Sequence, residues 1–278
     1  MIQLFFSSKA GRFLWPFVLA WGFLVLTFLI LPLLIITPLS FNSGAFLVFP
    51  LEGLSLRWYE AILTDNRWIT AAKNSLIIGF TATSLALAIG IPAALAIGLY
   101  KFRAKPAVSA LAGMPLVVPA VILAIGLFFA LSTVGLTNTL AGIIIAHAVL
   151  GMPFVVITIA AALQAFDVTL LRAGASLGAS PLRVFRTVTL PLLLPSVITG
   201  GLLAFITSFD EVVTVIFLGG PRQRTLPREM FDSLRESINP SILAVATILT
   251  VISTLLMVVA LRAMSRAAGA QPGMEQRK

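Results

Sequence analysis

Residues 167–191 read DVTLLRAGASLGASPLRVFRTVTLP and interrupt a chain that is otherwise strongly apolar. The stretch predicts two short helices that meet at Gly178. Asp167 can cap a first helix over 168–177, because its carboxylate can accept hydrogen bonds from the free backbone amides of a helix start. Gly178 suits the left-handed position that ends a helix, and Ser180-Pro181 provides a cap and a first residue for the second helix.

The composition is that of an integral membrane protein. The 278 residues are 59% hydrophobic and only 10% charged, and the mean hydropathy is +1.06, whereas soluble domains carry about 25% charged residues. The apolar runs have helix length and lack the alternation of barrel strands, which predicts an all-α membrane protein. The absence of cysteine excludes disulfides and thiol catalysis. A single histidine argues against a histidine metal site, and no metal is expected.

Six apolar segments are each long enough to cross a bilayer core of about 30 Å. They cover residues 13–40, 71–100, 107–134, 139–163, 189–218 and 240–263. We therefore expect six transmembrane helices in a single transmembrane domain over residues 1–278. Prolines inside the spans, such as Pro92, Pro119 and Pro153, predict kinks that pack against neighbouring helices.

The charges of the loops predict the orientation of the chain. The net charge is +9, and in a membrane protein such a basic excess marks cytoplasmic loops rather than nucleic-acid binding. With the N-terminus inside, most Lys and Arg residues fall in inner segments, where the acids are Asp167 and Glu275. Both termini are therefore expected to be cytoplasmic. The apolar run over 13–41 is too long for the core of a signal peptide, so we expect an uncleaved span.

In this orientation, segment 167–186 lies in the cytoplasm. Val168, Leu171 and Ala175, with small residues between them, give its first helix a compact apolar face. Such a face can seat in a groove of another protein. The alternative is an interfacial helix that lies on the bilayer surface. We favour the first interpretation, in which the segment is a handle through which another protein moves the membrane helices.

Asp210 and Glu211 are the acids inside a predicted span. A charge at the bilayer centre costs roughly 2.5–3.5 kcal/mol on insertion scales, so such residues usually face a cavity or a partner. On a continuous helix, Thr207 and Thr214 fall within the same arc as the two acids. These four residues predict a cation-attracting wall of a translocation path, since carboxylates can replace the hydration that an ammonium group loses. The alternative is a structural ion pair or a hydrogen bond between helices.

Two outer loops, over 42–70 and 219–239, are long enough to fold. Ser55 and Pro227 suit the starts of short helices in these loops. The loops predict either a docking surface for a soluble partner outside or packing segments at the membrane interface, and the pattern does not decide between them.

Three polar residues in or near the spans are expected to be structural. His147 lies in the middle of a predicted span, where a packed, hydrogen-bonded histidine is favoured over a ligand or a proton relay. Asn74 and Ser75 open the second span and are expected to cap it.

The sequence RAGASLGA over 172–179, followed by Leu190-Pro191, resembles the coupling loop of type I ABC importer permeases, whose usual pattern is EAAxxLGA…LP. The spacing agrees with the family pattern. Arg172 stands at the family's glutamate position, and Gly174 stands at its second alanine. Arg172 would therefore need an acidic partner.

The resemblance extends over about residues 55–263. SFDEVVTVIFLGGPRQRTLPREMF, over 208–231, is similar to permeases of spermidine/putrescine-type importers. The family implies a type I ABC importer permease fold in the bacterial inner membrane. It implies that the coupling surface contains Arg172, Ala173, Gly174, Leu177, Gly178, Ala179, Ser180 and Pro181.

The resemblance also implies partners and a substrate class. The partners are two cytoplasmic ATPase subunits that bind ATP and Mg²⁺, a second and different permease chain, and an external solute-binding protein. This chain has no GxxxxGK[ST] loop, and it is expected to perform no covalent chemistry and to bind no cofactor itself. The implied substrate is a small organic cation, a polyamine such as putrescine or spermidine.

Other functions stay open at this point. A related permease could carry an opine, an amino acid derivative or an anion. A self-sufficient secondary transporter could use Asp210 and Glu211 as a proton or sodium relay, although it would have no need of a coupling loop. An intramembrane enzyme is disfavoured, because the chain lacks cysteine and a paired His/Ser/Asp or metal constellation.

Overall fold

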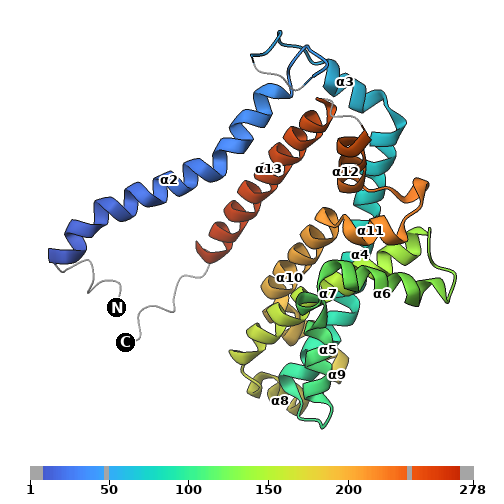
Figure 1. The fold of residues 1–278 in the computed structure, drawn as a ribbon. Coiled ribbons are helices and arrows are strands. Elements are labelled where there is room, and N and C mark those ends of the chain that lie inside the picture. Colours follow the sequence, from blue (N-terminus) through green and yellow to red (C-terminus); the bar gives the residue numbers. More distant parts are fainter. Residues whose placement is uncertain (1–8, 47–49, 237–239, 270–278) are drawn as a thin grey trace. The chain divides into compact units, whose positions relative to one another are not determined.

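A computed structural model of the chain describes residues 9–46, 50–236 and 240–269 (Figure 1). The described residues are mainly helical, with an isolated antiparallel bridge between Asn42 and Leu54. The chain divides into two compact units. One comprises Met1–Asp65 with Ser233–Lys278, and the other comprises Asn66–Asp232.

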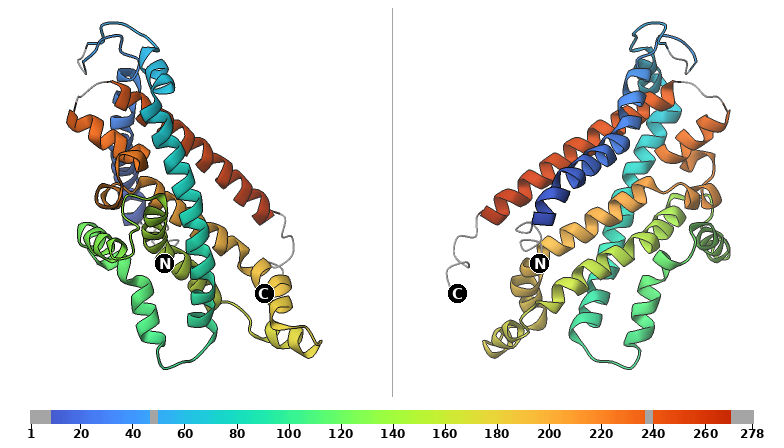
Figure 2. Two further views of the ribbon diagram at one scale, coloured as in Figure 1. Left: turned by 90° about the vertical axis from the view of Figure 1, so that its right-hand side faces the viewer. Right: turned by 60° about the vertical axis from the view of Figure 1, so that its left-hand side comes forward.

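The first unit contains α2 (Lys9–Leu39), α3 (Arg57–Thr64) and α13 (Ser241–Gly269). Helices α2 and α13 lie side by side, and α13 also contacts α3 (Figure 2). The side chains of α2 are apolar yet exposed within the chain, with Trp21 at 68% and Phe28 at 73%. An apolar surface of this extent requires lipid or another protein to cover it.

The loop between α2 and α3 is closed by hydrogen bonds around Asn42. The side-chain oxygen of Asn42 accepts from the backbone amide of Glu52 at 3.1 Å. The backbone carbonyl of Asn42 accepts from Trp58 Nε1 at 2.9 Å. The hydroxyls of Ser40 and Tyr59 lie 2.6 Å apart. Ser55 accepts from the amide of Arg57, the first residue of α3. These bonds connect the described parts of the first predicted outer loop with one another.

The second unit is built on α4 (Asn66–Leu99), α7 (Leu140–Gln164) and α10 (Leu190–Asp210), which pack against one another (Figure 2). Their shared core consists largely of small and β-branched residues, including Ala86, Val155 and Ala204. A methyl group added at Gly151 would lie 3.0 Å from the Cβ atom of Ala204. Small residues thus bring α7 and α10 into close contact, as is common between membrane helices.

The predicted span over 107–134 is bent at Pro119, where the sequence predicts a kink, and the bend is a complete break in the helix. The segment forms α5 (Lys105–Val117) and α6 (Ala120–Ser132), which are bent by 115° relative to each other. The break falls at Val118-Pro119, where Val118 is extended with ψ of 131°. Proline cannot donate a backbone hydrogen bond and pushes the preceding residue out of the helical region, so the helix ends here.

The predicted continuous span over 189–218 also differs from the structure. Helix α10 ends at Asp210, and α11 (Val213–Leu218) begins after a two-residue break. A short 3-10 turn, η2 (Pro221–Gln223), and α12 (Leu226–Glu236) follow. The chain therefore loses regular helix geometry between the two acids of the predicted pair, Asp210 and Glu211.

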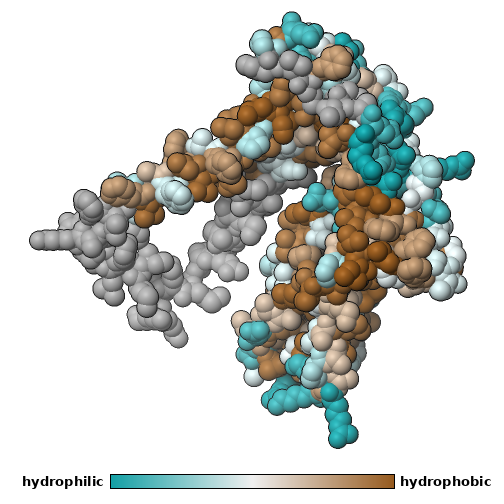
Figure 3. Space-filling view, in the orientation of Figure 1, coloured by the Kyte–Doolittle hydropathy of each residue, from teal (hydrophilic) through white to brown (hydrophobic). Residues whose placement is uncertain are grey.

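Four helices among the described residues are long and apolar enough to cross a membrane, and the bent α5–α6 pair makes a fifth if it counts as one span. Ser241–Leu255 is a shorter apolar helix within the region of the sixth predicted span. The chain is thus an all-α, multi-pass membrane protein. Figure 3 shows hydrophobic residues over the helices of the second unit and hydrophilic residues over α12. Six spans, one domain and cytoplasmic termini stay predictions.

Candidate functional site

The segment that follows α7 folds as two short helices. Helix α8 covers Thr169–Ser176 and α9 covers Pro181–Val184. The Asp167 carboxylate accepts a hydrogen bond of 2.8 Å from the Thr169 amide. Hydrogen bonds from the Thr169 side chain and amide lower the pKa of the Asp167 carboxyl. Asp167 therefore stabilises the start of the first helix, one residue later than the sequence predicts.

Gly178 and Ser180 separate the two helices. Gly178 has φ of +76°, in the left-handed region that only glycine adopts readily. Ser180 Oγ accepts from the Arg183 amide at 3.4 Å, and Pro181 occupies the first turn of α9. The chain continues through a π-helical segment, η1 (Phe185–Thr189), into α10. The helix pair is thus directly connected to the core helix α10.

This segment, Asp167–Thr189, presents both apolar and basic side chains. Leu177 is 88% exposed and Leu182 is 57% exposed. Arg172 is also exposed, whereas Gly174 faces α9. A methyl group added at Gly174 would lie 3.0 Å from Val184 Cγ2, so glycine lets the two helices approach closely. The remaining predicted residues, Ala173, Ala179, Ser180 and Pro181, lie in the same helix pair.

The acidic pair lies where α10 stops. Asp210 is the last residue of the helix, and Glu211 is extended with ψ of 121°. The Glu211 carboxylate accepts a hydrogen bond of 2.7 Å from the Thr214 amide and so caps α11. Asp210 is exposed, and its side chain has no hydrogen bond or ion pair to any of the residues that the structure describes. The two acids therefore differ: Glu211 has a structural role as a helix cap, whereas the Asp210 carboxylate has no partner among the described residues.

The helix break removes the basis of the predicted polar stripe. Thr207 is partly buried one turn before Asp210, whereas Thr214 is buried within α11. These residues do not share one face of a continuous helix, but they flank one break in it. Asp210 lies at the C-terminal, negative end of the α10 dipole, where a carboxylate is unfavourable and a cation is favourable.

His147 and Ser208 tie α7 to the last turn of α10. His147 is fully buried, and its Nδ1 atom lies 2.8 Å from Ser208 Oγ. The His147 Nε2 atom has no hydrogen-bond partner in the described part of the chain. The histidine is therefore packed and hydrogen-bonded, as the sequence predicts, and it fixes the helix turn that carries Asp210.

Asn74 and Ser75 do not cap the second span as expected, because α4 begins eight residues before Asn74, at Asn66. They hold the second predicted outer loop instead, a role that the sequence did not predict. Asn74 Nδ2 donates to the carbonyls of Arg222 and Arg224, both at 2.9 Å. Ser75 Oγ accepts from the amide of Leu226, the first residue of α12, at 2.8 Å. These bonds span about 150 residues of sequence, so no local pattern could have revealed them.

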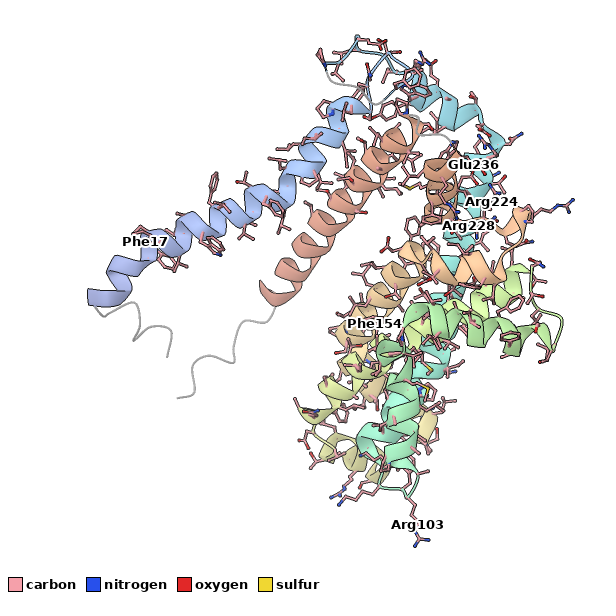
Figure 4. The ribbon with its side chains drawn as sticks, in the orientation of Figure 1. Phe17, Arg103, Phe154, Arg224, Arg228 and Glu236 are labelled. Atoms are coloured by element: carbon pink, nitrogen blue, oxygen red, sulfur yellow. The ribbon has the colours of Figure 1, made fainter. Side chains whose placement is uncertain are left out.

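A buried carboxylate, Glu229, holds the same loop. It is only 2% exposed and lies 3.1 Å from an Arg224 nitrogen and 3.8 Å from an Arg67 nitrogen. Arg228 pairs with Asp232 at 2.8 Å. Arg224 and Arg228 lie close together in Figure 4, beside the start of α12. Within the second unit, this part of the second predicted outer loop therefore packs on α4. That contact supports the interpretation of the loop as a packing segment rather than a docking surface.

The comparisons with known proteins agree with the membrane fold. A family model described as "Binding-protein-dependent transport system inner membrane component" matches residues 86–268. The spermidine/putrescine transport system permease protein PotC of Haemophilus influenzae is 34% identical over 86% of this chain and 93% of its own length. The putrescine transport system permease protein PotI of Escherichia coli is 36% identical over 80% of this chain and 82% of its own.

A solved structure has a similar fold. It is a bacterial alginate ABC transporter in complex with an alginate pentasaccharide-bound periplasmic protein. Its matched chain has a TM-score of 0.71 at 19% identity, over 96% of this chain and 98% of that one.

The family model and the curated relatives define the chain as a permease subunit of an ATP-binding-cassette importer. The chain belongs to the binding-protein-dependent transport system inner membrane component family, whose members are type I ABC importer permeases.

Proposed function

We propose that this chain forms part of the translocation path for a small organic cation, a polyamine such as putrescine or spermidine. The observation that carries the proposal is Asp210, an exposed carboxylate at the C-terminal end of a broken membrane helix, with no hydrogen bond or ion pair to the residues that the structure describes. A carboxylate at the negative end of a helix dipole attracts a cation. Irregular backbone at membrane depth is tolerated where protein buries it or where it lines a water-filled cavity.

The related permeases favour a polyamine over other cations. PotC and PotI are named for spermidine and putrescine transport, and they match this chain over most of their length. Glu211 contributes a second negative charge beside Asp210, while one of its oxygens caps α11. Thr207 is the predicted wall residue nearest to Asp210 on α10, and buried Thr214 contributes mainly to the cap.

The coupling segment transmits motion from an ATPase in this proposal. Exposed Leu177 and Leu182 supply apolar contacts, and exposed Arg172 requires an acidic group opposite it. Two ATPase subunits bind ATP and Mg²⁺ in the bacterial cytoplasm, and this chain performs no covalent chemistry. Because η1 connects α9 directly to α10, movement of the helix pair displaces the helix that carries Asp210.

The transport cycle is one of alternating access across the bacterial inner membrane. A second, different permease chain completes the path, and a loaded solute-binding protein docks on the outer side. ATP binding closes the ATPase dimer, which moves the coupling segments and opens the path outward, and hydrolysis resets it inward. The periplasmic protein in the related alginate transporter complex supports an external binding protein as partner.

The test is uptake by the complete importer with Asp210→Asn and Glu211→Gln combined. Both changes keep side-chain size, and glutamine keeps the oxygen that caps α11. We expect loss of polyamine uptake with normal co-purification of the ATPase. Unchanged uptake would contradict the proposed path. Uptake by this chain alone, driven by a proton or sodium gradient without an ATPase, would instead favour a secondary transporter.

A further inference from the structure

Three phenylalanine rings form a ladder between α4 and α10. The ring centroids of Phe80 and Phe205 are 4.9 Å apart. Those of Phe205 and Phe209 are 5.6 Å apart, with ring planes inclined by only 25°. Phe80 is 63% exposed and the other two rings are half-buried. The ladder therefore presents aromatic surface outside the core of the second unit.

The ladder ends beside the unpaired acid. Phe209 directly precedes Asp210 at the end of α10. Phe205 lies one helical turn earlier, about 6 Å along the axis toward the coupling segment. Both rings therefore lie within about one helical turn of Asp210 along the axis, at about 100° (Phe209) and 140° (Phe205) around it.

Gly79 builds this ladder into the fold. A methyl group added at Gly79 would lie 2.8 Å from Phe205 Cε2, so only glycine lets the ring lie this close to α4. The His147–Ser208 bond fixes the intervening turn of α10 from the other side. The position of the central ring is therefore set by backbone packing and not by loose side-chain contact.

We propose that Phe80, Phe205 and Phe209 form a binding surface for a linear polyamine as it passes Asp210. The inference rests on the proposed function and names a further site within it. A linear polyamine alternates ammonium groups with methylene chains. Aromatic faces attract ammonium groups within about 6 Å, and the rings also supply apolar surface for the methylene chain. The ladder thus matches both parts of the ligand.

Such a surface would also help the polyamine to dissociate from Asp210. Transport requires binding that is favourable enough for entry and weak or multi-site enough for exit. A carboxylate wall alone binds a polycation by charge, whereas uncharged rings offer a neighbouring, weaker site. Lipid or a helix of the second permease could also cover exposed rings, and these occupants are outcomes of the test.

The experiment replaces Phe209 with phenylalanines that carry one, two and three ring fluorines. Fluorine weakens the negative potential of the ring face while the shape of the ring changes little. The complete importer is placed in proteoliposomes with saturating binding protein, and uptake of labelled putrescine is measured per ATP hydrolysed. The matched control is the same series at Phe129, which is 64% exposed and also pairs with a neighbouring ring, Phe128.

We expect putrescine uptake to fall stepwise across the Phe209 series, by roughly 3- to 30-fold in total, and the Phe129 series to stay level. A flat Phe209 series overturns the inference, and so does a single drop without grading, which would indicate packing. In a second variant, Phe80→Leu, we expect slower uptake with normal co-purification of the second permease. Loss of that permease would assign the ring to an interface and also overturn the inference.

These outcomes are distinct from failure of the proposed function. If Asp210→Asn with Glu211→Gln keeps full uptake, or the importer carries no polyamine, the proposed function itself is contradicted. If the acid variant is inactive while the Phe209 series is flat, only the aromatic site is contradicted.

Discussion

Gly178 is expected to be required for coupling because of its backbone conformation. Its φ is +76°, and a side chain added there would meet nothing within 4 Å. The cost of Gly178→Ala is therefore conformational and not steric, about 1–2 kcal/mol for a left-handed residue with a Cβ atom. If the variant relieves this strain by changing the turn between α8 and α9, the ATPase must restore the turn on docking. Its apparent affinity would then fall by about 5- to 30-fold.

The assay titrates the ATPase subunit onto permease complexes in nanodiscs and measures binding and ATP hydrolysis. Asparagine tolerates left-handed conformations better than alanine, and β-branched valine tolerates them worst. The expected order of affinity at position 178 is therefore glycine, asparagine, alanine and valine. Gly113 in α5 is the matched control, because its added methyl would also meet nothing within 4 Å but no positive φ is required there.

A conformational role for Gly178 would be contradicted if Gly178→Val bound the ATPase as well as the natural chain does. Equal affinity of the asparagine and alanine variants would contradict it too, since the effect would then not depend on φ. Gly113→Ala is expected to be neutral or slightly stabilising, by up to about 1 kcal/mol of helix propensity.

Three further changes test the packing around the site. Glu229→Gln removes a buried charge that holds Arg224 at 3.1 Å. We expect the free energy of unfolding to fall by about 1–3 kcal/mol, measured by thermal unfolding of the permease complex in detergent. An unfolding transition unchanged from that of the natural chain would contradict a structural role for Glu229. Ser208→Ala leaves the buried His147 ring without its observed partner. The same measurement should show a free energy of unfolding lower by about 1–3 kcal/mol. An unchanged free energy of unfolding would mean that this hydrogen bond does not stabilise the fold. Because the folded pKa of Asp167 is lowered, its stabilisation of α8 is present above the unfolded pKa of 3.8 and is lost as pH falls through the folded value. Near neutral pH, the protection of the amides at the start of α8 against exchange should therefore not change with the ionisation of Asp167. Asp167→Asn should accelerate the exchange of these amides at neutral pH.

The helix pair α8–α9 could be predicted from sequence because its signals are local. Asp167, Gly178 and Ser180-Pro181 each act on backbone groups within a few residues, so the caps and the left-handed turn follow from residue type. The bend at Val118-Pro119 carried a local signal too. Pro119 predicts a kink in the span over 107–134, because proline restricts the preceding residue, but residue type alone does not give the bend of 115°.

The break after Asp210 could not be predicted in this way. The sequence there contains no glycine or proline, and its apolar pattern continues to Leu218. The break is stabilised by Glu211, which caps α11, and by packing of the flanking helices. The roles of Asn74 and Ser75 depend on backbone groups about 150 residues away. Tertiary contacts of this kind leave no periodic trace in the sequence.

The most direct measurement is ATP-driven uptake by proteoliposomes that contain this chain with its second permease, its ATPase and its binding protein. Labelled putrescine, a neutral amino acid and an inorganic anion are compared at equal concentration. We expect uptake of putrescine that requires ATP hydrolysis and is lost in the Asp210→Asn, Glu211→Gln variant. ATP-driven uptake of the anion or the neutral amino acid, with none of putrescine, would contradict a cation path at the end of α10.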